Sequence, residues 1–157
     1  INSAKRRLWI ATPYFVPDEG IINALKLAAL RGVDVRIILP RKNDLWLVQL
    51  AAYSYLVEFH NANIQFFWYR PGFMHQKVML IDDSTSVVGT ANLDNRSMKL
   101  NFEITALVLD KTFAGEMEEM LVKDFESSIQ ARRLDHDQKG FIFRISVRVA
   151  RLLSPIL

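Results

Sequence analysis

The fold of this chain is decided by residues 7–39, which read RLWIATPYFVPDEGIINALKLAALRGVDVRIIL. The run Arg7 to Thr12 is short and apolar, as in a buried strand. Pro17-Asp18-Glu19 then opens a helical pattern, and Gly32 is placed to cap that helix. The next apolar run, Val33 to Leu39, completes a strand-helix-strand unit. Such a unit predicts a parallel sheet, because the helix returns the chain to the edge where the first strand began.

Patterns downstream extend this unit into an α/β/α sandwich, in which helices flank a mixed sheet. Residues 44–60 carry apolar and aromatic groups at helical spacing, and a second long helix is expected at about 113–134. Further strands are expected at 64–69, 77–82, 86–89 and 103–109. Asp83-Ser84 is typical of a tight turn that joins two neighbouring strands.

The composition fits one globular domain and excludes several kinds of site. The 157 residues are 50% hydrophobic and 24% charged, which allows a substantial core. The absence of cysteine excludes disulfides, thiolate metal sites and a cysteine nucleophile. No apolar run reaches the roughly 18 residues that a membrane span needs. Ile1 to Lys5 shows neither an initiator Met nor a signal-peptide pattern, so we expect a segment of something longer.

The basic charge is concentrated in the last residues. The net charge is +3, but residues 131–157 carry six basic and two acidic side chains, so residues 1–130 sum to −1. A polar stretch, Asp135 to Gly140, marks the change, and we predict a domain at 1–134 and a basic tail at 135–157. A nucleic-acid-binding domain would usually spread Lys and Arg over its folded body. We therefore expect no nucleic acid as a partner.

The tail has the pattern of an amphipathic helix. Arg144, Arg148 and Arg151 fall on one face of such a helix. Apolar residues occupy a separate face: Ile142, Ile145, Val149, Leu152 and Ile156. This pattern is typical of a helix that lies on anionic lipid. The alternative is a packed helix with a solvated basic face.

Polar residues that suit phosphoryl transfer gather around one predicted strand. In HQKVMLID, residues 75–82, His75 and Lys77 are two apart, so both side chains point to the same face. Asp82 closes the strand and is expected to tie down the turn that follows. Three more polar segments come next: Gly89 to Asn92, Asn95 to Ser97 and Asn101 to Glu103. The ends of strands are where α/β folds usually place their sites.

These side chains cover the roles that phosphoryl transfer needs. The reaction requires a nucleophile or base near neutral pKa, for which His75 is the candidate, and donors around the nonbridging oxygens. Lys77, the Asn92 amide and the Thr90 hydroxyl are the candidate donors. Glu103 is the candidate to accept a hydrogen bond from the second ring nitrogen of His75 and so fix its tautomer.

The spacing HxK(x)4D followed by G-[ST]-x-N resembles the HKD signature of the phospholipase D superfamily. The matching residues are His75, Lys77, Asp82, Gly89, Thr90 and Asn92. Thr90 stands where serine is more frequent in that motif, and it keeps the hydroxyl. Segments similar to the second half of bacterial cardiolipin synthases are 12–18, 89–97, 101–103 and 151–157. The resemblance covers essentially the whole chain and implies a phospholipase D-like fold.

The resemblance also implies that this chain is half of an active site. In that family two HKD motifs meet at a pseudo-twofold axis, where one histidine attacks the phosphodiester and the other protonates the leaving alcohol. The chain holds one such motif. The second half would come from an N-terminal half of the same protein or from a homodimer mate, and the lone chain would be inactive. No metal or cofactor is implied, because lysines supply the positive charge.

The implied reaction is the transfer of a phosphatidyl group between two phosphatidylglycerol molecules through a phosphohistidine, which forms cardiolipin and releases glycerol. In two-motif relatives the nucleophile is more often the N-terminal histidine, so His75 is expected to be the general acid/base. The implied location is the cytoplasmic face of a bacterial plasma membrane, with anionic lipid as a partner.

The expected site residues form two groups. The catalytic group is His75, Lys77, Asp82, Asn92 and Glu103, with Asp82 in a structural role. The substrate-binding group is Gly89, Thr90, Arg96, Ser97 and Tyr14. Gly89 would permit close backbone approach, and Tyr14, beside a strand end, would line a lipid cleft.

Two other interpretations stay open. The first is a phosphodiesterase that acts on nucleic acid as a homodimer of single-motif chains; the near-neutral body and the basic tail disfavour it. The second is a degenerate half that serves as a scaffold or lipid tether; the intact His75, Lys77 and Asn92 disfavour it.

Overall fold

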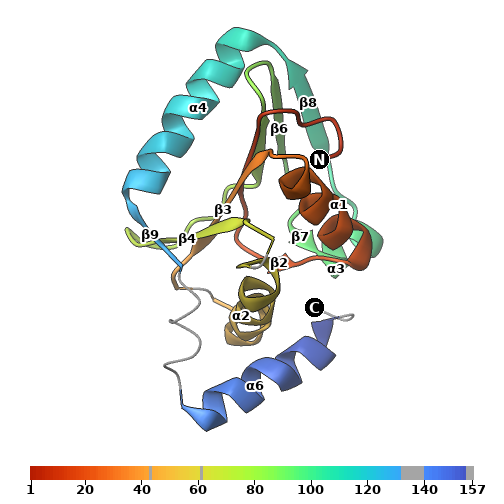
Figure 1. The fold of residues 1–157 in the computed structure, drawn as a ribbon, viewed down its shortest axis with the longest axis vertical. Helices are drawn as coiled ribbons and strands as arrows, with labels where there is room; N and C mark the ends of the chain where they lie inside the picture. Colours follow the sequence, from red (N-terminus) through yellow and green to blue (C-terminus); the bar gives the residue numbers. More distant parts are fainter. Residues whose placement is uncertain (43, 61, 132–139, 155–157) are drawn as a thin grey trace.

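The computed structural model describes residues 1–42, 44–60, 62–131 and 140–154, and it has the predicted α/β architecture (Figure 1). The strands are β1 (Arg7–Ala11), β2 (Phe15–Val16), β3 (Asp34–Pro40), β4 (Gln65–Tyr69), β5 (Val78–Ile81), β6 (Thr85–Gly89), β7 (Leu93–Asp94), β8 (Thr105–Leu109) and β9 (Ser128–Gln130). The helices are α1 (Glu19–Leu30), α2 (Trp46–His60), α3 (Asn95–Lys99), α4 (Lys111–Glu126) and α6 (Phe141–Leu152).

The main sheet is mixed, as expected. It has seven strands in the order β8-β6-β5-β1-β3-β4-β9, and β2 and β7 form a separate pair. β1 pairs in parallel with β3, with Ile10 opposite Ile37, and β3 pairs in parallel with β4. On its other side β1 pairs antiparallel with β5. The parallel unit predicted from residues 7–39 is confirmed, and it occupies the middle of the sheet.

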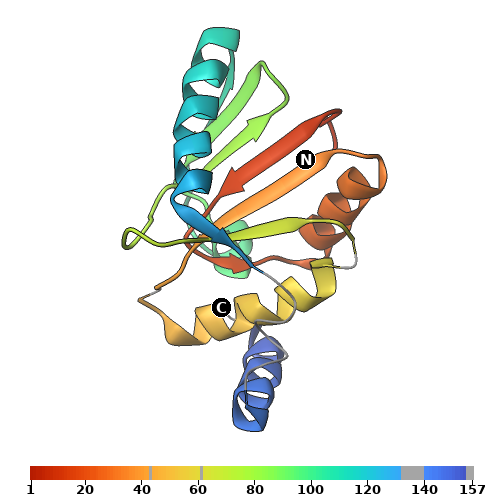
Figure 2. The same ribbon diagram turned by 60° about the vertical axis from the view of Figure 1, so that its left-hand side comes forward.

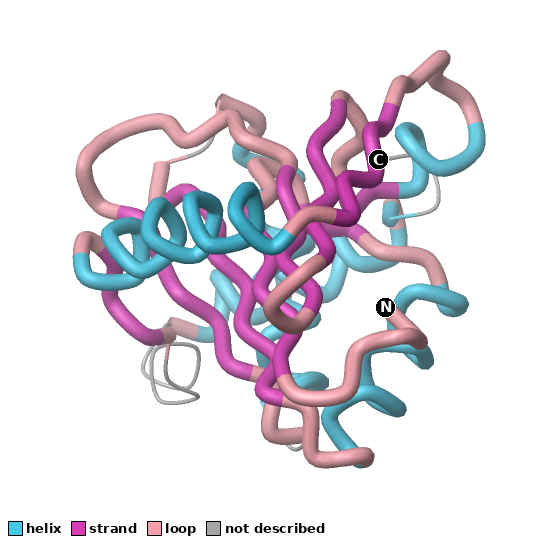
Figure 3. Tube along the Cα trace, turned by 90° about the horizontal axis from the view of Figure 1, so that it is seen from above, coloured by secondary structure: helices cyan, strands magenta, loops and turns pink. Residues whose placement is uncertain are grey.

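The sheet separates two hydrophobic cores, because alternate residues of a strand point to opposite faces. Leu8 and Ile10 of β1 pack with residues of α1 and α2, while Trp9 and Ala11 pack with residues of α4 on the other face. Seen from above, the strands run between the helical layers (Figure 3). The predicted α/β/α sandwich is therefore confirmed.

Local signals define the first helix where the sequence predicts it. The Asp18 carboxylate accepts a hydrogen bond from the Ile21 backbone N–H at 3.0 Å and caps α1. The buried face consists of Ile22, Leu25 and Ala28. Gly32 follows the helix with φ +84°, the left-handed conformation that ends many helices. The predicted start and cap are both confirmed.

The helix predicted at 113–134 is shorter than expected. It begins at Lys111, capped by the Asp110 carboxylate, and it ends at Glu126. The chain then forms β9, which pairs antiparallel with β4. Without β9, β4 would be the edge of the sheet, so backbone pairing overrides the helical pattern there.

The C-terminal helix α6 packs against α2 on the outer side of the molecule (Figure 2). Val147 and Ala150 are buried, and the Phe143 ring meets the Tyr53 ring edge-on, with centroids 5.3 Å apart. The predicted boundary at residue 134 lies outside the described residues. Within the described part of the chain, no helix combines the length and the apolar character that crossing a bilayer would require.

Candidate active site

The register of the sheet brings the polar motif segments to one end of it. Ala11 at the end of β1 pairs with Val78 at the start of β5. Gly89 at the end of β6 pairs with Thr105 at the start of β8. β5 and β6 are antiparallel neighbours, so the start of one lies beside the end of the other. The segments that adjoin these strand ends are 75–77, 90–97 and 101–104.

Glu103 is the centre of a hydrogen-bond network at this end. Its carboxylate accepts hydrogen bonds from Thr90 Oγ1 and from the Asn101 side-chain amide, the latter at 3.1 Å. Thr90 Oγ1 also accepts a hydrogen bond from the Ile104 backbone N–H at 3.0 Å. The bonds from these two side chains, with a smaller effect of the Lys77 charge, hold the pKa of Glu103 below its usual value. Glu103 therefore carries a negative charge at neutral pH.

Lys77 brings a partly buried positive charge to the same place. Burial lowers the pKa of its ammonium group, and the carboxylates of Glu103 and Asp94 oppose part of that effect. Lys77 Nζ donates a hydrogen bond to the His75 carbonyl oxygen at 2.9 Å. Among the described residues this bond uses one of the three donors of the ammonium group. The remaining donors are available to an anion.

Lys77 also lines a cavity of about 140 Å³ next to β1, β5 and β6. The rest of the wall is mostly apolar and includes Ile10, Val78, Met79, Val87, Leu93 and Met98. Sites of this kind orient a ligand by a few polar groups in an apolar surround. An ammonium group in such a wall suits a ligand in which an anionic group adjoins hydrocarbon.

Asn92 begins a small structure that the sequence analysis does not predict. Its backbone N–H donates to Ser97 Oγ at 3.1 Å, and Asp94 caps α3 by accepting from the Ser97 N–H at 2.7 Å. The side-chain oxygen of Asn92 is buried and has no hydrogen-bond partner among the described residues. An unpaired buried polar group costs about 1–3 kcal/mol. Rotating the amide by half a turn would exchange the positions of its oxygen acceptor and its NH2 donor.

His75 is exposed and lies in the irregular segment that precedes β5. Its ring lies beside that of Phe73, with centroids 5.5 Å apart. The expected hydrogen bond to Glu103 is not formed within the described part of the chain, where the Glu103 carboxylate accepts from the two donors described above. The placement of His75 on a strand is also wrong, since β5 begins at Val78. The imidazole is therefore open to a substrate and is not held by this half.

Asp82 lies at the opposite end of the sheet. It follows Ile81, which pairs with Leu8 near the beginning of β1. Its carboxylate accepts hydrogen bonds from three consecutive backbone N–H groups at 2.8–3.2 Å, those of Lys5, Arg6 and Arg7. Burial by itself would raise the pKa of Asp82, but these donors outweigh it and lower the pKa. Asp82 therefore lies apart from the other expected site residues, and these hydrogen bonds join the turn after β5 to the beginning of β1.

We expect Asp82→Asn to lower stability without changing catalysis. Because the folded pKa of Asp82 is lowered, its contribution is present above the pKa of an unfolded aspartate and is lost as the pH falls through the folded value. The neutral amide should cost about 1–3 kcal/mol at neutral pH. Urea unfolding of the intact protein as a function of pH measures both the loss and its weaker acid dependence.

Asp83→Asn is the matched control for that measurement. The Asp83 carboxylate forms ion pairs with Arg6 and Arg7, but its side chain is 52% exposed. Exposed ion pairs contribute at most about 1 kcal/mol. Equal losses in the two variants would show that the three backbone hydrogen bonds to Asp82 do not stabilise the strand.

The residues expected to bind substrate are mostly engaged within the protein. Tyr14 donates its hydroxyl proton to Asp44 at 2.9 Å, and burial, followed by this hydrogen bond, raises the pKa of Tyr14 to about 12. Ser97 is buried within α3. The Thr90 hydroxyl, expected to face a phosphate, donates to the carboxylate described above. Arg96 is exposed, and its side chain forms no hydrogen bond with the described residues, so it remains available to a ligand.

Gly89 allows close backbone approach, but the neighbour that approaches is β8. A Cβ at this position would lie 2.6 Å from the Ile104 carbonyl oxygen and 3.0 Å from Thr105 Cα. Both contacts are with backbone atoms, which cannot move as the end of a flexible side chain can. The separation of β6 and β8 at the site therefore depends on glycine.

We expect Gly89→Ala to destabilise the protein by about 1–3 kcal/mol, because the start of β8 must shift. Gly115→Ala is the matched control, since a Cβ there would meet no atom within 4 Å apart from the neighbouring backbone of α4. A glycine inside a helix costs about 0.5–1 kcal/mol relative to alanine, so the control should gain stability. Denaturant unfolding compares the two variants, and an unchanged midpoint for Gly89→Ala would contradict the close approach.

Thr12 joins the strand ends of the site, although no local pattern in the sequence indicates it. The residue is buried; its hydroxyl donates to the Tyr14 carbonyl oxygen at 3.0 Å and accepts from the Leu93 N–H at 3.4 Å. It thereby links the end of β1 to β7. A signal for α3 was available, because Asp94 stands three residues before Ser97 in the manner of a helix cap.

The groups at this end of the sheet suit a phosphodiester. The imidazole of His75 is exposed, the ammonium group of Lys77 is partly buried, and the amide of Asn92 has an unsatisfied atom. Two of these groups can neutralise or bind nonbridging oxygens while the first moves a proton or attacks phosphorus. Within residues 1–42, 44–60, 62–131 and 140–154, no cluster of three His, Cys, Asp or Glu side chains is arranged to hold a metal ion.

Comparison with known proteins gives one family and a set of close relatives. A family model described as "Cardiolipin synthase, PLD-like domain" matches residues 1–125. Cardiolipin synthase A of Pseudomonas putida is 49% identical over all 157 residues of the chain. The chain spans only 33% of that relative's length, so about a third of a longer protein corresponds to it.

Solved structures share the fold at low sequence identity. Nuc from Salmonella typhimurium, described as a phospholipase D family member, has a TM-score of 0.73 at 23% identity, and the match covers 83% of this chain and 85% of that one. Phosphatidylserine synthase of Haemophilus influenzae Rd KW20 has a TM-score of 0.77 at 16% identity, over 99% of this chain and 42% of that one. These likenesses concern the architecture of the sheet and its helices.

Proposed function

Because this chain belongs to the cardiolipin synthase, PLD-like domain family, we propose that it supplies one of the two half-sites of a phosphatidyltransferase. The proposed reaction moves a phosphatidyl group from one phosphatidylglycerol to a hydroxyl of a second. It forms cardiolipin and releases glycerol. The proposal places the enzyme at the cytoplasmic face of a bacterial plasma membrane.

One observation carries this proposal. An exposed imidazole, a partly buried ammonium group and a carboxamide with an unpaired buried atom adjoin the same end of the sheet. They come from His75, Lys77 and Asn92, which also match the family's motif. The cavity beside Lys77 is mostly apolar, which suits a lipid phosphate better than a nucleotide.

The proposed steps need a histidine on each half. In the first step the histidine of the other half attacks phosphorus, the bond from phosphorus to the glycerol oxygen breaks, and His75 donates a proton to that oxygen. In the second step His75 accepts the proton of the incoming phosphatidylglycerol hydroxyl, whose oxygen attacks phosphorus and displaces the first histidine. Lys77 and Asn92 stabilise the charge on the nonbridging oxygens.

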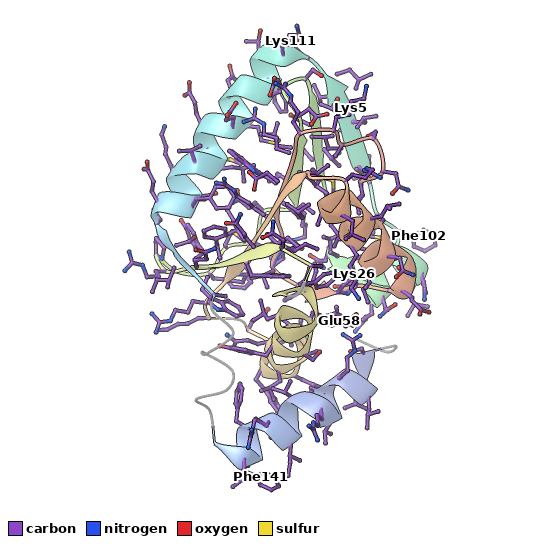
Figure 4. All side chains as sticks on the ribbon, in the orientation of Figure 1. Lys5, Lys26, Glu58, Phe102, Lys111 and Phe141 are labelled. Carbon is purple, nitrogen blue, oxygen red and sulfur yellow. The ribbon has the colours of Figure 1, made fainter. Side chains whose placement is uncertain are left out.

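The surface beside the site supports the need for a second half. Five large apolar residues form what we call the β8 strip: Leu100 (72% exposed), Phe102 (108%), Ile104 (75%), Leu107 (61%) and Leu109 (75%). The strip adjoins the site directly, because the Thr90 N–H donates to the Ile104 carbonyl oxygen at 2.9 Å. Figure 4 shows Phe102 at the outer margin of the molecule. An exposed apolar patch of this kind is typical of an interface, and we propose that the second half packs here.

An assay of the intact protein on labelled phosphatidylglycerol tests the proposed function. We expect cardiolipin and free glycerol in equal amounts and no cleavage of DNA. Cleavage of DNA without lipid turnover would favour the nucleic-acid phosphodiesterase instead. If the protein neither turns over the lipid nor cleaves DNA, yet binds vesicles, the half is a scaffold and the enzymatic proposal fails.

A further inference from the structure

Helix α6 exposes an apolar face that no described residue covers. The side packed against α2 carries Val147 and Ala150, which are buried. The opposite side carries Ile142 (80% exposed), Leu152 (79%), Val149 (50%) and Ile145 (45%). Figures 1 and 2 show α6 as the outermost layer, beyond α2, and Figure 4 shows Phe141 at the start of this helix. The helix therefore has two apolar faces, and α2 uses one of them.

The charges on α6 divide between the protein and the exposed side. Arg151 is bound internally: its guanidinium group lies 3.7 Å above the centre of the Tyr55 ring and pairs with Glu58 at 3.1 Å. Arg144 and Arg148 are exposed and border the uncovered apolar face. The helix has no acidic residue between 141 and 152. The exposed surface of α6 is thus apolar in its middle and basic along one border.

We propose that this exposed face of α6 docks into the surface of an anionic lipid bilayer, with the helix axis in the plane of the membrane. The 12 residues span about 18 Å, less than the roughly 30 Å of the hydrocarbon core. An apolar face buried at the level of the headgroups, with arginines beside lipid phosphates, is the arrangement that such a helix adopts. The choice of lipid as the occupant rests on the proposed function.

The end of α6 is also hydrogen-bonded to the element that carries part of the site. The Asn95 side-chain amide donates to the Ser154 carbonyl oxygen at 2.8 Å and to the Val16 carbonyl oxygen at 3.2 Å. Asn95 is the first residue of α3 and stands three residues after Asn92. Docking of α6 would therefore fix the position of the site relative to the lipid surface.

Fluorescent labelling tests this docking locally, because the 157 residues contain no cysteine. In the intact protein, with any other cysteine replaced by serine, a polarity-sensitive dye is attached at Ile142→Cys. Leu30→Cys on α1 is the matched control, since both side chains are 80% exposed. With phosphatidylglycerol vesicles we expect a blue shift and protection from aqueous quencher at position 142 and neither change at position 30.

The border arginines should set the lipid preference. Arg144→Gln with Arg148→Gln should weaken the vesicle affinity reported by the dye at position 142 roughly 25-fold, at about fivefold per charge. Vesicles of phosphatidylcholine alone should give the same weak response with the parent protein. Equal responses to the two kinds of vesicle would contradict the role of the arginines.

Two results would overturn the proposal. If the dye at position 142 is shielded before vesicles are added, another part of the protein covers α6. If it stays open to quencher on vesicle-bound protein, the membrane is held elsewhere. Synthase activity on detergent-dispersed phosphatidylglycerol separates this proposal from the proposed function. If the dye at position 142 enters vesicles but the enzyme has no transferase activity, the proposed docking surface is supported and the proposed reaction is contradicted.

Discussion

Replacing His75 with alanine should lower the rate of cardiolipin formation by a factor of about 10²–10⁴, the range expected when a general acid/base is removed. The side chain is exposed and forms no hydrogen bond with the described residues, so the thermal unfolding midpoint should not change. Activity of the intact enzyme on phosphatidylglycerol measures the first effect and calorimetry the second. An enzyme that keeps its full rate without this imidazole would remove His75 from the mechanism.

A substrate with a different leaving group distinguishes the two possible roles of His75. A phosphatidyl ester of p-nitrophenol needs no proton on its leaving oxygen. If His75 is the general acid, His75→Ala should release p-nitrophenol from this substrate at nearly the normal rate in the first turnover. A first turnover that stays slow would instead identify His75 as the nucleophile.

Lys77→Met should reduce the rate by about 10²–10³, because one donor to the transition-state oxygens is lost. Lys111→Met is the matched control. Lys111 is exposed and follows β8 at the end where Leu109 pairs with Thr85, opposite to the end that holds the site. Figure 4 shows Lys111 at the start of α4, the end of that helix that is farther from β9. The control should keep its rate; a similar loss in both lysine variants would point to general electrostatic attraction of the lipid rather than to a contact in the site.

The lysine also predicts the alkaline side of the pH profile. Burial lowers the pKa of Lys77 below the 10.5 of an ordinary lysine. The charged form is the one that binds phosphate, so the rate should fall as the pH rises through that lowered pKa. Lys77→Arg keeps its charge at higher pH and should move the fall to higher pH, whatever its rate at neutrality. If the rate of Lys77→Arg falls at the same alkaline pH as that of the parent enzyme, the group that titrates there is not Lys77.

The sequence predicted those helices and strands whose caps and buried faces depend only on neighbouring residues. The cap at Asp18 and the buried face of α1 are consequences of neighbouring residues, and the structure has both. β9 could not be predicted in this way. Ser128 to Gln130 form a strand because β4 offers an unpaired edge there, and that edge depends on the order of strands across the whole sheet. The pair β2 and β7 likewise joins residues 15–16 to residues 93–94.

The candidate site, like the fold, could be predicted from the sequence only in part. The spacing of His75 and Lys77, with the later Gly89 to Asn92 segment, predicted which segments meet, because strand register then brings them to one end of the sheet. The partners of individual side chains were not predictable. Thr90 reaches Glu103 only because β6 and β8 pair closely. Asp82 belongs to the same sequence motif, but the length of β5 carries it to the other end.

The place of β1 has a consequence for how this polypeptide is made. β1 leaves the ribosome before the other strands of this sheet. Its neighbours in the sheet are β3 and β5, and β5 begins only at Val78. During synthesis Leu8 to Ala11 can pair on one side long before the other side exists. A nascent chain stalled before Ile81 should therefore keep an uncovered central strand and bind chaperones, and release from them should coincide with the emergence of β5.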